Sequence, residues 1–161
     1  MEEAFEHRII QHVEPVWRER ANYICQGIVE GAKDPPMREQ LWARKLHGNE
    51  FEMCCIPYFL YNLALGDVVT LRERDIVDAV VRRSGRSVYR IWLADEMVDR
   101  LQIHRDLASL GALQEWRTAN LCSIDAADAA VSKAVMHYLT ERASKRELEF
   151  EGGSIFPDEI T

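Results

Sequence analysis

The sequence lacks the features that would place it in a membrane or an oxidising compartment. No stretch approaches the roughly 18 apolar residues of a membrane span, and the start, Met1 to Glu6, is acidic where a secretory signal is basic. Cysteine is scarce, shows no C-x-x-C spacing, and includes an adjacent pair, Cys54 and Cys55, that cannot easily bridge to itself. We therefore expect a soluble, cytoplasmic protein whose cysteines, Cys25, Cys54, Cys55 and Cys122, are reduced and mostly buried.

Recognisable catalytic and metal-binding motifs are also missing. The sequence has no P-loop and no G-x-G-x-x-G, and its five histidines, His7, His12, His47, His104 and His137, form no H-E-x-x-H pair. Each histidine is expected at the surface or half-buried. Asp67 follows Gly66 at a turn and is expected to accept hydrogen bonds from local backbone, with general-base work a minor alternative. The sequence predicts a protein that is not an enzyme and holds no metal or cofactor; an enzyme would need an unrecognised deep site.

Length and charge set the broad class. The chain has 161 residues, of which 47% are hydrophobic, so it can bury a core as one domain or as two half-sized modules. Its 27 acidic residues outnumber its 20 basic residues and give a formal net charge of -7. A surface of this charge repels nucleic acid and anionic lipid. A charged partner is therefore expected to be basic.

The first half has the pattern of a small β-barrel. Residues 22–30 are rich in Tyr, Ile and Val, and a hairpin follows in which His47-Gly48-Asn49 joins two strands. Five strands in all are enough to close a barrel or form a strongly coiled sheet. Residues 1–21, where Pro15 stops a short helical stripe, are expected to form a peripheral N-terminal arm. The barrel-like module is assigned to residues 22–84, with strands at 22–30, 41–46, 50–56, 68–72 and 76–83.

The second half, residues 85–151, has the order β-α-β-β-α-β and predicts a ferredoxin-like plait. Asp95 can cap a first helix that carries Met97, Val98 and Leu101 and ends at Gly111. The second helix has one core-facing stripe of Val131, Ala134, Val135, Tyr138 and Leu139. Residues 152–161 are expected as a C-terminal tail, because Gly152-Gly153 and Pro157 interrupt any regular element. The fold class is α+β, with strands at 88–93, 112–118, 120–125 and 145–151.

Four motifs occur in a fixed order: Leu41-Trp42-Ala43, Ile56-Pro57-Tyr58-Phe59, Leu63 to Val69, and Ser84-Gly85-Arg86-Ser87-Val88-Tyr89-Arg90. Over residues 38–150 the chain resembles DUF4265, an uncharacterised bacterial family with the pattern L-W-A, I-P-F-F, L-G-D-V-V and S-G-H-S-x-x-R. Arg86 stands where the family usually has His, and the first twenty residues have no clear counterpart. The resemblance implies a family fold and a bacterial source, and it carries no activity.

The leading functional hypothesis rests on an acidic strand and tail. Carboxylates spaced along one strand face, followed by an adaptable tail, can imitate a nucleic-acid backbone and enter a basic cleft of another protein. We expect a non-enzymatic bacterial immunity (antitoxin-like) protein that occludes the active site of a cognate secreted toxin, with no membrane or nucleic acid as partner. The alternative is a solvated edge strand protected by its charges. The proposed partner-binding residues are Glu147, Glu149, Glu151, Asp158 and Glu159.

A second hypothesis uses a local concentration of positive charge. Guanidinium groups around a glycine that permits close backbone approach can hold a phosphate, as in a regulator that binds RNA or a phosphorylated ligand. Trp92 shares a strand face with Arg86 and Arg90, although a core or interface position is favoured for it. Solvated arginines that pair with the plentiful acids are the simpler interpretation. The residues concerned are Arg82, Arg83, Ser84, Gly85, Arg86 and Arg90.

Overall fold

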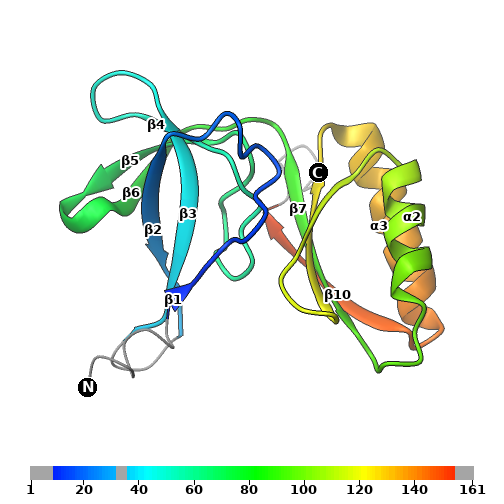
Figure 1. Cartoon of the computed structure of the whole chain (residues 1–161). Coiled ribbons are helices and arrows are strands. Elements are labelled where there is room, and N and C mark those ends of the chain that lie inside the picture. Colours follow the sequence, from blue (N-terminus) through cyan, green and yellow to red (C-terminus); the bar gives the residue numbers. More distant parts are fainter. Residues whose placement is uncertain (1–8, 32–35, 155–161) are drawn as a thin grey trace.

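The computed structural model describes residues 9–31 and 36–154, and in them it shows two β-sheets and two α-helices. Three layers follow one another in Figure 1: a β-barrel, a second sheet and a pair of helices. The expected α+β class with a barrel and a second module is confirmed. Within the described residues no helix is long and apolar enough to cross a membrane.

The barrel is closed by five strands. They follow one another as β3-β2-β6-β5-β4, and β4 pairs with β3 to complete the ring. All contacts in the ring are antiparallel except the short parallel contact of β2 with β6, which pairs Gln26 with Ile76. The strands are β2 (Tyr23–Ile28), β3 (Arg38–Lys45), β4 (Phe51–Met53), β5 (Val68–Arg72) and β6 (Ile76–Arg82), with the 3-10 turn η1 (Glu73–Asp75) before β6.

Alternation along β3 creates the barrel core. Leu41 and Ala43 are fully buried, and they pack with residues of β2, β4 and β5. The connection of residues 54–65 is largely buried and contributes Cys55, Leu60 and Leu63 to the same core. All four cysteines lie among the described residues and are buried without a disulfide, as the sequence predicts.

The second sheet has the strand order β10-β7-β9-β8, with every neighbouring pair antiparallel. Both helices cover the same face (Figure 1), and Leu107, Val135 and Leu139 pack there against Tyr89 and Ile91. The opposite face lies toward the barrel. The elements, in chain order, are β7 (Ser87–Leu93), α2 (Arg100–Ser109), β8 (Leu113–Trp116), β9 (Leu121–Ala126), α3 (Ala129–Ser144) and β10 (Leu148–Ser154).

The start of the first helix differs from the sequence-based expectation. Asp99, not Asp95, is the N-cap of α2, and it accepts a hydrogen bond of 3.0 Å from the Gln102 amide. Asp95 accepts from the Met97 amide at 2.8 Å in the preceding turn. Met97 is 91% exposed and Leu101 is 61% exposed, so neither belongs to a core-facing stripe. The buried residues of α2 begin only at Ile103. The helix therefore starts after Asp99, which is nearer to Ile103 than Asp95 is.

The end of the second sheet also differs. Gly152 and Gly153 do not interrupt β10, which continues to Ser154 with a register shift between Gly152 and Ser154. Gly153 is needed where the strand passes Arg90, because a Cβ atom at this position would lie 2.7 Å from Arg90 Cζ. β10 therefore begins and ends three residues later than the expected strand 145–151, because Lys145 is the C-cap of α3 and residues 145–147 form a turn.

Residues 9–21 do more than lie at the periphery. The short strand β1 (Ile9–Ile10) pairs in parallel with the start of β3, and Ile10 is buried. His12 is 2% exposed, so the expectation of a surface or half-buried histidine is wrong at this position. Its burial depends on Glu39 and Glu115, which are distant from it in sequence, so no motif spacing predicts the contact. The expected tail residues Asp158 and Glu159 lie outside the described residues.

Candidate functional site

A buried ionic cluster joins the barrel to the second sheet. His12 lies between Glu39 on β3 and Glu115 on β8, with Nε2 and Nδ1 each 2.7 Å from a carboxylate oxygen. Two carboxylates on one imidazole favour the doubly protonated ring, because each nitrogen then donates a hydrogen bond. Burial alone lowers the pKa of His12, but the hydrogen bonds and charges of Glu115 and Glu39 raise it to about 9.

Each of the two carboxylates accepts hydrogen bonds from His12 and from two backbone amides. Glu39 accepts hydrogen bonds of 2.8 Å from the amides of Tyr58 and Phe59, and Glu115 accepts from the amide of Ile56 at 2.5 Å. The His12 ring also stacks on Tyr58, with ring centroids 4.1 Å apart. The cluster is buried, and its carboxylates hold the backbone amides of the connection of residues 54–65 in place. This arrangement suits structural coupling better than chemistry on a substrate.

Arg90 is buried at the same junction. Its guanidinium donates to the backbone oxygen of Leu60, lies 3.5 Å from a Glu151 oxygen, and stacks over the ring of Tyr61 at 4.9 Å from the ring centroid. Burial lowers the pKa of Arg90, and the charges of Glu39 and Glu151 oppose that effect. Arg90 therefore links the second sheet to the barrel connection and does not face solvent.

The other arginines of the expected basic patch also have partners within the chain. Arg86 makes two hydrogen bonds to Asp125, of 2.9 and 2.6 Å, and lies over the ring of Trp17. Burial raises the pKa of Asp125, and the Arg86 guanidinium counteracts this. Arg82 pairs with Glu50 at 2.7 Å on the barrel surface. These guanidinium groups are distributed among separate acids and do not converge on one point.

Asp67 organises the turn that leads into the second sheet. Its carboxylate accepts hydrogen bonds from the amides of Ala64 and Ser84 at 3.0 and 2.8 Å, which confirms the expected local backbone role. Arg83 lies 3.2 Å from the same carboxylate. Gly85 has a φ of 85°, a left-handed conformation that favours glycine. Ser84-Gly85 is therefore explained by chain geometry at the junction.

The acidic strand is only partly open. Glu147 pairs with Arg142 at 3.1 Å, and Glu151 accepts hydrogen bonds from the Tyr61 hydroxyl. Glu149 is exposed, and no ion pair reaches its carboxylate from any described residue. Of the three glutamates expected on this strand, Glu149 is therefore the one whose carboxylate is free to contact a partner.

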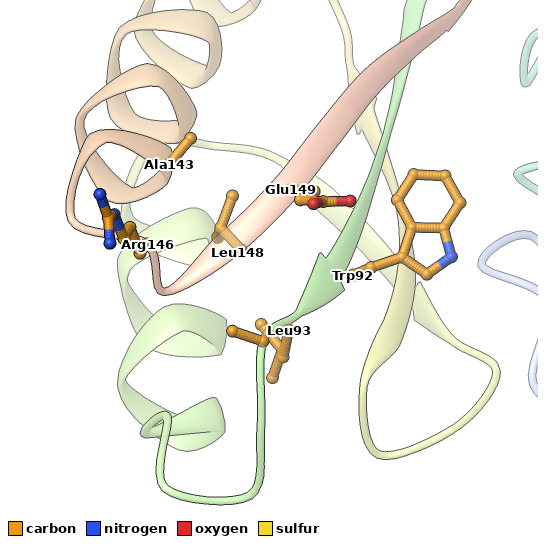
Figure 2. A pocket seen from close by; sticks show the side chains of 7 residues that line it. Trp92, Leu93, Ala143, Arg146, Leu148 and Glu149 are labelled. Carbon is orange, nitrogen blue, oxygen red and sulfur yellow. The ribbon is translucent and has the colours of Figure 1, made fainter.

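Surface hollows gather at the same end of the second sheet. One of about 520 Å³ is lined by Trp92, Leu93, Ala94, Ala143, Arg146, Leu148 and Glu149. Figure 2 shows its side chains on both sides of β10, with Glu149 directed toward Trp92. Two neighbouring hollows, of about 430 and 450 Å³, flank the loop before α2 and share Asp95 and Val98. The loop and the edge of β10 thus form one uneven surface, which is the candidate binding surface.

Sequence reasoning missed the buried cluster and the hollows. His12 is separated from Glu39 by 27 positions and from Glu115 by 103, so no motif spacing connects them. One local signal was available: Glu39 falls in the same alternation as Leu41 and Ala43, the buried face of β3. Among the described residues no group of three or more His, Cys, Asp or Glu side chains could hold a metal ion.

Comparison with known proteins gives a family and a fold. No curated protein matches the chain. A solved structure, described as a novel crystal structure of a hypothetical protein from Neisseria gonorrhoeae, is similar with a TM-score of 0.70 and 16% sequence identity. The match covers 83% of this chain and 96% of that chain, and at this identity it supports the fold alone. The family model described as "Domain of unknown function (DUF4265)" matches residues 39–150, so the chain belongs to the DUF4265 family.

Proposed function

We propose that this protein is a non-enzymatic, cytoplasmic immunity protein of a bacterium, which binds a cognate secreted toxin and occludes its basic active-site cleft. One contrast carries the proposal: the arginines of the expected basic patch are paired with acids of the chain, whereas Glu149 remains open beside a hollow of the surface. A surface with open carboxylates attracts a basic partner and repels nucleic acid.

The candidate binding surface combines acidic charge with exposed apolar side chains. The three hollows are lined by five carboxylates and three guanidinium groups. Met97, in the loop before α2, is 91% exposed, and Leu101, in the first turn of α2, is 61% exposed. Apolar side chains within a charged rim are typical of protein interfaces. The charged groups are Asp95, Glu96, Asp99, Glu147, Glu149, Arg100, Arg142 and Arg146.

The alternative function, a regulator that binds RNA or a phosphorylated ligand, has less support. It requires Arg82, Arg83, Arg86 and Arg90 to reach one ligand, and each of these side chains already contacts an acid or a backbone oxygen of the chain. An enzyme also has less support, since the histidine with the strongly raised pKa, His12, is sealed from solvent.

We also infer that the second sheet is a ferredoxin-like plait. The inference is supported by the chain order β7-α2-β8-β9-α3-β10 together with the sheet order β10-β7-β9-β8. In this arrangement the helices cover one face and the barrel covers part of the other. A partner is therefore left with the sheet edges and the loops at its ends, which is where the candidate binding surface lies.

The experiment tests binding and protection together. The full chain is co-expressed with the product of the neighbouring gene, and complex formation and survival of the host are measured. Glu149→Lys is expected to weaken the complex at least tenfold, since it turns an attractive charge into a repulsive one. Glu73→Lys, with the same charge change at the exposed 3-10 turn of the barrel, is the matched control. If no toxic, basic product is bound or neutralised, the proposed function is wrong.

A further inference from the structure

β10 is an edge strand of the second sheet. It pairs with β7 on one side, and among the described residues no strand pairs with its other side. The Ala94 amide donates to the Glu147 oxygen, so the backbone of Glu147 faces β7. Because these directions alternate along an antiparallel strand, the N–H and C=O groups of Leu148 and Phe150 face outward. This edge can therefore form a further ladder of hydrogen bonds.

The 520 Å³ hollow lies along this open edge and includes both faces of the sheet. Trp92 and Glu149 line it on the face away from the helices, and Ala143 and Leu148 line it on the helix-covered face (Figure 2). An added strand would project successive side chains to these two faces in turn. The hollow thus gives room for side chains on both sides of such a strand.

Trp92 and Glu149 place an aromatic ring beside a carboxylate on one face of the sheet. They are direct partners in the register of β7 and β10, so their side chains are neighbours on one face. No described cation lies over the Trp92 ring or within an ion-pair distance of Glu149, although several other aromatic rings have an arginine over them. An aromatic face beside a carboxylate attracts an Arg or Lys side chain.

The accessible edge is short. Toward its C-terminal end the Gly153 oxygen accepts a hydrogen bond from the Asn62 amide, and Glu151 accepts from the Tyr61 hydroxyl. These barrel contacts limit the open edge to about Leu148–Glu151. A segment of four or five residues is enough to cover it, as in recognition by strand addition.

We propose that the basic partner binds by adding an extended segment to the outer edge of β10. One Arg or Lys of that segment lies against Trp92 and Glu149, and the next side chain, an apolar one, packs against Leu148 and Ala143. This inference rests on the proposed function for the identity of the partner. It adds the mode of recognition, which combines main-chain hydrogen bonds with alternating side-chain chemistry.

The test uses the full ¹⁵N-labelled chain and two synthetic peptides, Thr-Leu-Arg-Leu-Thr and Thr-Leu-Glu-Leu-Thr. The arginine peptide is expected to slow hydrogen exchange at the Leu148 and Phe150 amides and to shift the Trp92 indole resonance. The glutamate peptide should do neither. Glu149→Gln is expected to weaken binding of the arginine peptide roughly fivefold. Glu141→Gln, at an exposed position of α3, is the matched control and should leave binding unchanged.

The outcomes separate the two proposals. Exchange at Leu148 and Phe150 that stays unchanged, both with the arginine peptide and in a complex with the neighbouring gene product, overturns strand addition while the proposed function stands. Slowed exchange with the arginine peptide, in a protein that neutralises no toxin, supports strand addition and overturns the immunity role. An N-methylated arginine peptide that binds as well as the parent would also contradict the main-chain ladder.

Discussion

His12 joins the two sheets through buried carboxylates on each of them. Replacing it with Ala leaves the buried carboxylates of Glu39 and Glu115 without their shared cation. Removing one partner of a buried ion pair costs about 3–5 kcal/mol, because the remaining charge is uncompensated. We therefore expect His12→Ala to lower the free energy of unfolding by about this amount, measured by urea denaturation.

His104 provides the matched control for that measurement. It lies on the exposed side of α2 and contacts Gln114, so His104→Ala should change the free energy of unfolding by less than about 0.5 kcal/mol. A similar small effect at both histidines would contradict the assigned role of His12.

Gly153 has a steric reason to be glycine. A methyl group at this position would lie 2.7 Å from Arg90 Cζ and 2.8 Å from an Arg90 nitrogen, and Arg90 is held in place by Leu60 and Glu151. We expect Gly153→Ala to destabilise the protein by about 1–3 kcal/mol, as overpacking does. Thermal denaturation compares it with Ser154→Ala, the next position of β10, which should have a clearly smaller effect.

At the scale of elements, the N-terminus of α2 depends on a single cap. Asp99 accepts a hydrogen bond from the Gln102 amide, whereas Asp95 acts in the turn before the helix. Asp99→Ala is expected to cost about 1 kcal/mol of stability, the usual effect of losing an N-cap. Asp95→Ala is the comparison and should cost less. The reverse order of the two effects in urea denaturation would place the functional cap at Asp95.

Elements with strong periodicity could be predicted from the sequence. The stripe that includes Val135 and Leu139 defines α3, and the alternation of Leu148 with Glu149 defines β10, because a buried face imposes its own period on a helix or strand. The start of α2 could not be fixed in this way. Two aspartates precede the helix, and the packing of Ile103 and Leu107 against the sheet decides between them.

The candidate site was less predictable than the fold. The three strand glutamates were identified, but only tertiary contacts distinguish the open Glu149 from Glu147 and Glu151, which Arg142 and Tyr61 engage. The arginines were expected to form one binding patch because they are close in sequence. Their acidic partners, such as Asp125 for Arg86, lie on other strands, so the guanidinium groups point to separate places.

At the scale of the whole molecule, the two sheets form one connected structure. Glu39 belongs to the barrel and Glu115 to the second sheet, and His12 bridges them while Arg90 reaches the barrel connection from β7. Apolar contacts of Val88 with Ile56 and Leu65 complete the junction. Separation of the barrel from the second sheet would expose these charges and apolar groups together, so we expect a single unfolding transition.

The same junction makes the stability of the whole chain depend on pH. The pKa of His12 is raised from 6.5 to about 9 in the folded protein, so between these values the folded state binds more protons than the unfolded state. The contribution of His12 is therefore complete below pH 6.5 and is lost as the pH rises through about 9. The loss is on the order of 3 kcal/mol.

Urea denaturation of the wild-type protein and His12→Ala from pH 6 to pH 10 measures this contribution. Burial also raises the pKa values of Cys25 to about 12 and Cys54 to about 11, so thiol ionisation favours unfolding at alkaline pH in both proteins. The contribution of His12 is thus the difference between the two curves, which should be largest below pH 6.5 and shrink toward pH 10. If this difference stays constant over the pH range, His12 joins the two sheets as a neutral imidazole and not as a cation between Glu39 and Glu115.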